Sequence, residues 1–296
     1  MIPSFIITFR ETLEMALIVG IILSYLSRIK QTRYNNIVYA GVASGIAASV
    51  VGALLFSAIA GGFTGRSEEI FEGITMLIGA FLLTGMILWM MKQKHVATEL
   101  EQKVATELVQ ARRFGLFLLV FIAILREGIE IVIFLGASNF ASTDNNLIGA
   151  LNGIAAAILL GYAIFFGSMK INLKKFFEIT SILLILFAAG LVAHGVHEFQ
   201  EAHIVPTAIE HVWDINPPLD SDNSYPLLHE KGYIGSLLKG LLGYNGNPSL
   251  IEVLSYLIYL VFAFVLWKNI DKMHKMSRFH PEYSPGTRRE ASLLDR

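Results

Sequence analysis

Two charged motifs interrupt long apolar stretches of this sequence. One lies at residues 10–14, Arg-Glu-Thr-Leu-Glu, and the other at residues 126–130, Arg-Glu-Gly-Ile-Glu. An ionisable side chain at the centre of a membrane-spanning helix costs about 2.5–3.5 kcal/mol on insertion scales. The motifs therefore predict that these charged side chains face one another or a wet cavity rather than lipid.

The spacing within each motif suits a metal-binding site. Glutamates three positions apart lie on one face of a helix, and this holds for both pairs, Glu11 with Glu14 and Glu127 with Glu130. Four carboxylates around one point form an anionic oxygen cage. Such a cage suits hard cations such as Mg, Ca, Mn and ferric iron, and it disfavours Cu(I). The neighbouring arginines, Arg10 and Arg126, would offset part of the negative charge.

Three other interpretations of the motifs stay open. The arginines and glutamates could form salt bridges that hold two helices together, although one carboxylate per arginine would suffice for that. Paired glutamate helices also build di-iron enzymes, but those sites need Glu-x-x-His, and none of the eight histidines lies near either motif. A transporter of another hard divalent cation, such as manganese, fits oxygen ligands as well.

A second polar group lies at the end of a later apolar stretch. His194, His197, Glu198 and Glu201 are spaced at i, i+3, i+4 and i+7, which is the pattern of one helical face. Imidazole together with carboxylate could capture a metal ion at the outer entrance of a transport path. The alternative is a solvated helix end that anchors the loop after it.

The composition indicates an integral membrane protein. Of the 296 residues, 54% are hydrophobic and 16% are charged, whereas soluble domains carry about 25% charged residues. The chain has no cysteine, which excludes disulfide scaffolds, zinc–thiolate sites and thiol catalysis. The net charge is −1 and no stretch forms a basic patch, so nucleic acid is not expected as a partner.

Seven apolar stretches have about the 20 residues that a membrane helix needs. They cover residues 3–27, 37–60, 71–91, 114–137, 147–168, 176–197 and 250–268. The protein is therefore predicted to be all-α and polytopic. Residues 92–113 are predicted to form a cytoplasmic amphipathic helix that rests on the headgroups. Five prolines predict an irregular extracytoplasmic loop at 198–249, and residues 269–296 are predicted to be a cytoplasmic tail.

The distribution of lysine and arginine predicts the orientation in the membrane, because cytoplasmic connections carry an excess of both. The connections on one side of the predicted helices hold 18 basic residues and those on the other side hold three. This asymmetry places the N-terminus outside and the C-terminus in the cytoplasm.

The first six predicted helices form two related units. The motif at residues 10–14 and its copy at 126–130 are 116 residues apart, and small residues in the second helix, such as Gly45, recur in the fifth at an offset of 108. An odd number of spans per unit means that the second unit crosses in the opposite sense, as in inverted-repeat transporters. The predicted units are 1–91 and 114–197, and residues 250–268 form a seventh helix outside the repeat.

The pair of Arg-Glu-x-x-Glu motifs, in the first and fourth of seven spans, resembles the oxidase-dependent iron transporter family. That family comprises the high-affinity iron permeases of fungi and the iron-uptake permeases of bacteria. The stretch Ala193–Glu201 (Ala-His-Gly-Val-His-Glu-Phe-Gln-Glu), Gly243-Tyr244 and Asn247-Pro248-Ser249 are also similar. The resemblance covers nearly the whole chain, and the short tail resembles the bacterial members.

The resemblance implies a permease rather than an enzyme, located in the plasma membrane (the bacterial inner membrane). It implies import of iron, with Glu11, Glu14, Glu127 and Glu130 as the ligands on the path. Iron, ferrous or ferric, is then the transported substrate, and no permanently bound cofactor is expected. The expected partners are iron ions and the lipid bilayer, with an extracytoplasmic iron-binding or iron-oxidising protein as a candidate.

Overall fold

The computed structural model describes residues 2–92, 96–109, 113–141, 146–165, 173–207, 209–216, 225, 229 and 233–279, and within these residues it contains helices and no strand. The elements are α1 (Ile2–Arg28), the short 3-10 helix η1 (Thr32–Tyr34), α2 (Asn35–Ala60), α3 (Arg66–Lys92), α4 (Val96–Val109), α5 (Arg113–Ala141), α6 (Asn146–Phe165), α7 (Leu173–Glu201), α8 (Tyr233–Leu242) and α9 (Leu250–Phe279).

The described residues of each of the seven apolar stretches lie in one long helix, so the all-α prediction is confirmed for them. Residues 166–168 of the stretch 147–168 lie outside the described residues. Five of these helices, α2, α3, α6, α7 and α9, have the length and hydropathy of membrane spans. The other two, α1 and α5, are 27 and 29 residues long. They differ from the five because each carries an Arg-Glu-x-x-Glu motif near its middle.

The segment 198–249 contains more regular structure than its prolines predict. Helix α7 continues to Glu201, and residues 233–242 form α8. The apolar residues of α8 recur at helical spacing, as in Ile234, Leu238 and Leu241, and the prolines flank this helix without entering it. Helix α9 extends to Phe279, so the first part of the predicted tail is helical. Parts of the predicted segments 92–113, 198–249 and 269–296 lie outside the described residues.

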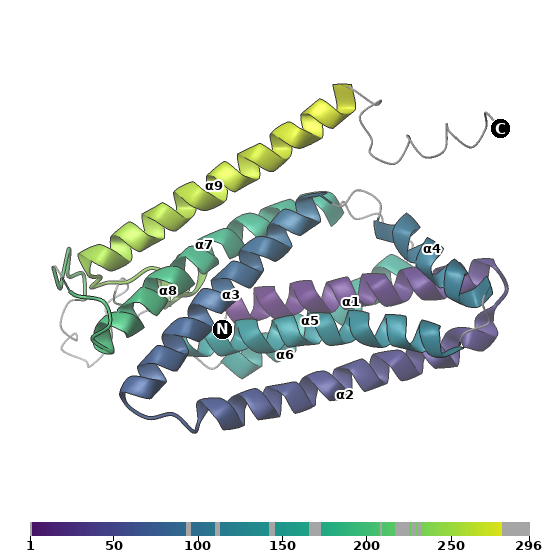
Figure 1. Ribbon diagram of the computed structural model, residues 1–296, viewed down its shortest axis with the longest axis horizontal. Coiled ribbons are helices and arrows are strands. Elements are labelled where there is room, and N and C mark those ends of the chain that lie inside the picture. Colours follow the sequence, from purple (N-terminus) through teal and green to yellow (C-terminus); the bar gives the residue numbers. More distant parts are fainter. Residues whose placement is uncertain are drawn as a thin grey trace, which may run out of the picture.

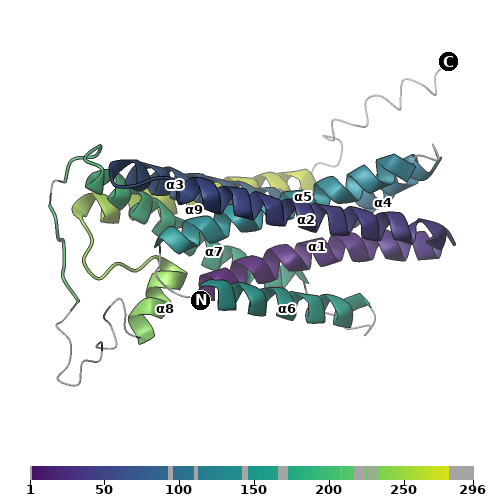
Figure 2. The ribbon, with the colours of Figure 1, turned by 90° about the horizontal axis from the view of Figure 1, so that it is seen from below.

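Three helix pairs dominate the packing: α1 with α6, α2 with α5, and α3 with α7. Figure 1 shows α3, α7 and α9 running at an oblique angle to the more nearly parallel helices α1, α2 and α5. Figure 2 shows α6 beside α1 along much of its length. Helices α1 and α5 thus lie in the interior, each covered by the second helix of the other predicted unit.

Glycines permit the closest of these contacts. A Cβ atom on Gly153 of α6 would lie 2.5 Å from the backbone oxygen of Phe5 in α1, and one on Gly45 of α2 would lie 3.2 Å from the backbone oxygen of Phe121 in α5. Small residues let helix backbones approach each other in membranes. The four residues occupy corresponding positions in the two predicted units, because their numbers differ by 108 and 116.

Two apolar clusters lie along the bundle and leave the charged motifs between them. One cluster includes Ile7 of α1 and Phe134 of α5, together with residues of α3 and α7. The other includes Ile22 of α1 and Ile124 of α5, together with residues of η1, α2 and α4. Each Arg-Glu-x-x-Glu motif therefore lies on its helix between a residue of one cluster and a residue of the other.

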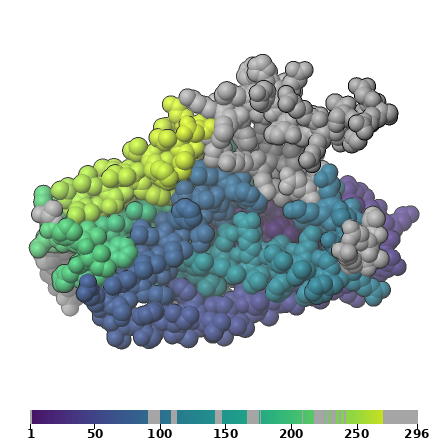
Figure 3. All heavy atoms as spheres, in the orientation of Figure 1, coloured from purple at the N-terminus to yellow at the C-terminus, as the bar shows by residue number. Residues whose placement is uncertain are grey.

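Helices α4 and α9 pack on the outside of this arrangement. Helix α4 contacts α1 and α5, and its Val104 is fully buried in the second cluster. The carboxylate of Glu101 in α4 lies 2.7 Å from a guanidinium nitrogen of Arg28 in α1. The helix predicted in this segment thus packs against the bundle. Helix α9 packs against α7 and, less extensively, α3, and Figure 3 shows it along one edge of the molecule.

Candidate functional site

Three of the four motif glutamates come together in the interior. Carboxylate oxygens of Glu11 and Glu14 in α1 and of Glu127 in α5 lie within 4.8 Å of one another. Glu11 is 0% exposed and Glu127 is 5% exposed. Oxygen ligands bind Mg²⁺ and Ca²⁺ at about 2.0–2.6 Å, so two oxygens that share an ion can be about 4–5 Å apart. The spacing of the triad is compatible with one shared cation.

The triad contains buried oxygen atoms without hydrogen-bond partners. Both carboxylate oxygens of Glu11 and Oε2 of Glu127 are in this state, and so is Oε2 of the nearby Glu130. Buried carboxylates are normally paired or bound to a metal, because leaving water without a new partner is costly. A cation between the carboxylates would supply the missing partner.

The two arginines differ in burial and in contacts. Arg10 is 0% exposed, its Nε lies 3.2 Å from Oε1 of Glu14, and its guanidinium also contacts the sulfur of Met90. Arg126 is 46% exposed and its guanidinium lies 4.7 Å from the centre of the Trp89 ring. A cation over an aromatic ring is attracted by the ring's negative face. Arg10 is thus fully enclosed, whereas Arg126 lies at the surface of α5.

The ion pairs of both arginines stay within their own helix. Arg10 pairs with Glu14 in α1, while Arg126 lies 2.9 Å from Glu130 and 3.9 Å from Glu127 in α5. Each principal pair joins residues four positions apart and so stabilises a single helix. The described ion pairs therefore do not join α1 to α5, as the salt-bridge interpretation of the motifs would require.

Glu130 is the one motif glutamate that is not part of the triad. Its Oε1 pairs with Arg126, and its side chain lines a small cavity of about 160 Å³ next to Trp89 and Met86. The sequence pattern alone gives the four glutamates equal standing, because it cannot show which rotamer each adopts. The structure separates a group of three whose oxygens lie close together from one that pairs with Arg126 beside a side cavity.

The second group of sequence-predicted residues lines a large cavity at the end of the molecule where α7 ends and α9 begins. This cavity has a volume of about 680 Å³. Its lining includes the four residues predicted from helical spacing, His194, His197, Glu198 and Glu201, and polar residues from the following segment, Glu210, His211, Asn216, Lys239, Asn245 and Glu252. The predicted face of α7 therefore opens onto a polar space.

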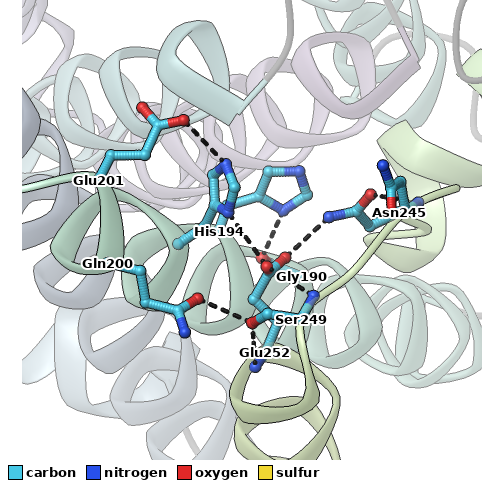
Figure 4. A network of polar contacts seen from close by, with 9 residues as sticks. Gly190, His194, Gln200, Glu201, Asn245, Ser249 and Glu252 are labelled. Carbon is cyan, nitrogen blue, oxygen red and sulfur yellow. Dashed lines mark hydrogen bonds and ion pairs between the residues drawn. The ribbon is translucent and has the colours of Figure 1, made fainter. Parts of the chain in front are cut away.

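The contacts of the two histidines differ. Nδ1 of His194 lies 2.9 Å from the backbone oxygen of Gly190, one turn earlier in α7. Nδ1 of His197 lies 3.1 Å from Oε1 of Glu252, and its Nε2 lies 3.3 Å from Oε1 of Glu201. Figure 4 shows these contacts converging near the start of α9. His197 thus connects two carboxylates, one on its own helix and one on α9.

Glu252 is a residue of this site that belongs to neither of the sequence-predicted groups. It is 1% exposed, and Asn245 donates a hydrogen bond of 2.7 Å to its Oε2 while the backbone N–H of Ser249 donates one of 3.0 Å to its Oε1. The only sign of Glu252 in the sequence is that an acidic residue stands at the third position of an apolar helix. In sequence it reads as a favourable first-turn acid, and only the fold places it beside His197.

Comparison with known proteins identifies the family. The model of the iron permease FTR1 family matches residues 1–272. The ferrous iron permease EfeU of Escherichia coli O6:H1 is 34% identical over 271 residues, which cover 90% of this chain and 94% of that protein. The ferrous iron permease EfeU of Yersinia pestis is 36% identical over 271 residues, which cover 90% of this chain and 93% of that protein. No solved structure matches.

These similarities confirm the resemblance drawn from the paired motifs. The relatives are named permeases, which is consistent with a transporter rather than an enzyme. Together with the five helices that have the length and hydropathy of spans, they indicate a multi-pass protein of the inner membrane. The chain belongs to the iron permease FTR1 family.

Proposed function

We propose that the protein imports iron across the inner membrane and that the ion passes between the carboxylates of Glu11, Glu14 and Glu127. The observation that carries the proposal is the buried triad, whose oxygens lie within 4.8 Å of one another between two apolar clusters. The relatives are named ferrous iron permeases, which favours ferrous iron over manganese as the substrate. The membrane potential supplies about 2.3 kcal/mol per charge per 100 mV for inward movement of a cation.

Glu130 serves as a further ligand on the same path. It follows Glu127 by three residues on α5 and lies on the same helical face. With the orientation predicted from the basic residues, the C-terminal end of α5 faces outward, so an incoming ion meets Glu130 before it meets Glu127. The pairing of Glu130 with the half-exposed Arg126 supports such a role, because this carboxylate lies at the border of the buried site.

The cavity of about 680 Å³ between the end of α7 and the start of α9, here called the outer cavity, is the proposed capture site. Its lining combines the imidazoles of His194 and His197 with the carboxylates of Glu198 and Glu201, and imidazole and carboxylate are both ligands of first-row divalent metals. In the predicted orientation this cavity faces outward. An ion bound there is concentrated at the outer end of the bundle before it moves toward the triad.

The proposed architecture is seven membrane helices, built as two inverted units of three plus α9. Its support is the reciprocal packing of α1 on α6 and of α5 on α2, with the glycine contacts at corresponding positions described above. The absence of cysteine allows a direct test of orientation. Single cysteines at Ser67, in the first turn of α3, and at Thr32, between α1 and α2, are expected to react with an impermeant reagent from outside and inside, respectively. Labelling of both positions from the same side would contradict the proposed topology.

Uptake into proteoliposomes tests the transport proposal. We expect ferrous iron to enter faster than ferric or manganous ions, and Glu→Gln substitution at each of the four glutamates to reduce uptake at unchanged protein abundance. Glutamine keeps the size of the side chain but loses its charge, which separates ligation from packing. Glu178→Gln, at an exposed position near the start of α7, is the matched control. Unchanged uptake in all four variants would refute the proposed path.

A further inference from the structure

His197 is held between two carboxylates that lie at opposite nitrogens of its ring. Glu252 is at Nδ1, at 3.1 Å, and Glu201 is at Nε2, at 3.3 Å. The surroundings of the two carboxylates differ, because the side chain of Glu252 is 2% exposed whereas that of Glu201 is 55% exposed. One carboxylate is part of the packed interior between α7 and α9, and the other faces the cavity.

The hydrogen bonds of Glu252 determine which atom of His197 is available for a metal. Its carboxylate already accepts hydrogen bonds from Asn245 and from the backbone of Ser249, which hold it in one position. A carboxylate only accepts hydrogen bonds, so the short contact to Nδ1 requires that Nδ1 carry the proton. In a neutral imidazole the lone pair is then on Nε2, the nitrogen that faces Glu201.

The pair formed by Nε2 of His197 and the carboxylate of Glu201 has the geometry of a two-ligand metal site. When the imidazole of His197 is neutral, Nε2 and the carboxylate oxygen are two acceptor atoms 3.3 Å apart, and they repel each other unless a proton or a metal cation lies between or beside them. Histidine and glutamate four positions apart on a helix can bind one ion together, as in helical metal sites. Building on the proposed capture role of this cavity, we propose that His197 Nε2 and Glu201 bind ferrous iron as a pair, and that Glu252 positions the imidazole for it.

This arrangement is the usual one for metal-bound histidines, which donate the other ring N–H to a carboxylate or a carbonyl. It also gives α9 a specific role. Helix α9 lies outside the proposed repeat, yet it supplies Glu252, and the segment before it supplies Asn245 (Figure 4). The capture pair on α7 is therefore complete only when α9 is packed in place.

The test is an anaerobic titration of ferrous iron into the purified full-length protein, in which the heat of binding is measured by calorimetry. The wild-type protein is expected to show two classes of binding site, an outer class at His197 and Glu201 and a central class at the triad. His197→Gln and Glu201→Gln should each lose the outer class. Glu252→Gln should keep it with a Kd raised about 10–100-fold, the usual loss when such a supporting carboxylate is removed. Glu210→Gln, which changes another carboxylate of the same cavity, is the matched control and should bind as the wild type does.

The same titration separates a positioning role from a merely structural one. If Glu252→Gln lowers the unfolding temperature but leaves the outer Kd unchanged, Glu252 only ties α9 to α7 and the inference is wrong. It is also wrong if His197→Gln retains the outer class or if the wild type lacks one. Should Glu252→Gln fail to fold, Asn245→Ala removes one support of the carboxylate, and an unchanged outer Kd in that variant overturns the inference.

A further variant distinguishes this inference from the transport proposal. The Glu11→Gln variant should lose the central class of iron-binding sites and the uptake of iron, and it should retain the outer class of sites. Wild-type uptake by Glu11→Gln would count against the central path and leave the outer pair standing. In uptake assays, Glu252→Gln should raise KM and leave the maximal rate largely unchanged, whereas a general loss of folded protein would lower the maximal rate.

Discussion

Glu11→Gln should affect stability and transport in opposite directions. Glu11 is fully buried, and neither of its carboxylate oxygens has a hydrogen-bond donor. Its charge therefore contributes no described contact that holds the fold together, and it lies close to two other carboxylates. Glutamine has nearly the same size, so the packing around it should survive. The substitution removes a ligand from the cage without creating a void.

The magnitude follows from the separations within the triad. Two unit charges 4.8 Å apart interact by about 3.5 kcal/mol at an effective dielectric constant of about 20. Because 4.8 Å is the largest separation within the triad, this is the smallest repulsion, at that dielectric constant, that Glu11→Gln relieves for each ionised neighbour, Glu14 or Glu127. A divalent ion has twice the charge and binds closer than 4.8 Å, so its attraction to a carboxylate is larger than this repulsion. We therefore expect uptake to fall at least about tenfold, which corresponds to about 1.4 kcal/mol.

Two measurements on the same preparations check this expectation. Thermal unfolding of the iron-free protein in detergent should show a midpoint that is equal to the wild type or higher. Uptake of ferrous iron into proteoliposomes, normalised to the protein incorporated, should show the loss of transport. The control Glu178→Gln should change neither. A lower unfolding midpoint together with normal uptake would show that the carboxylate serves the fold, and the reasoning would be refuted.

Two further predictions concern the arginines and the helix contacts. Arg10→Lys should lower the free energy of unfolding by about 1–3 kcal/mol, because lysine lacks the planar guanidinium fork and leaves buried partners unsatisfied. Arg126→Lys, at a 46% exposed position, should change the free energy of unfolding by less than about 1 kcal/mol. Chemical denaturation of both variants checks the difference. Gly153→Ala should destabilise the protein by about 1–3 kcal/mol through overpacking against α1, while Gly52→Ala, whose Cβ would meet nothing within 4 Å, should stabilise it by about 0.5–1 kcal/mol. Equal effects of the two glycine substitutions in the same denaturation assay would contradict the packing described here.

Much of the fold could be predicted from the sequence because the bilayer limits the possibilities. Apolar stretches of about 20 residues have to be helices, since every backbone polar group must be satisfied within the segment. The predicted stretches 37–60 and 147–168 correspond closely to α2 and α6. Helix α8 was not predicted, because in a loop rich in prolines a ten-residue amphipathic segment gives a weak signal. Its position depends on packing against α7, which local sequence does not encode.

The candidate site divides in the same way. Local spacing places Glu11 and Glu14 on one face of a helix, and it does the same for the residues of α7 that line the outer cavity. It does not indicate that Glu130 turns toward Arg126 while Glu127 joins the triad, or that the two arginines differ in burial. Rotamer choice and exposure depend on neighbouring helices, and these come from distant parts of the chain.

The sequence by itself determined the class of protein, the long apolar helices and the family, because hydropathy, periodicity and paired motifs are local properties that repeat along the chain. Only the tertiary structure decided which charges meet. The triad exists because α1 and α5 pack against each other in the interior. Glu252 meets His197, 55 residues earlier in the chain, because α9 packs on α7. Such encounters depend on how helices pack, and one-dimensional spacing carries no information about contacts between helices.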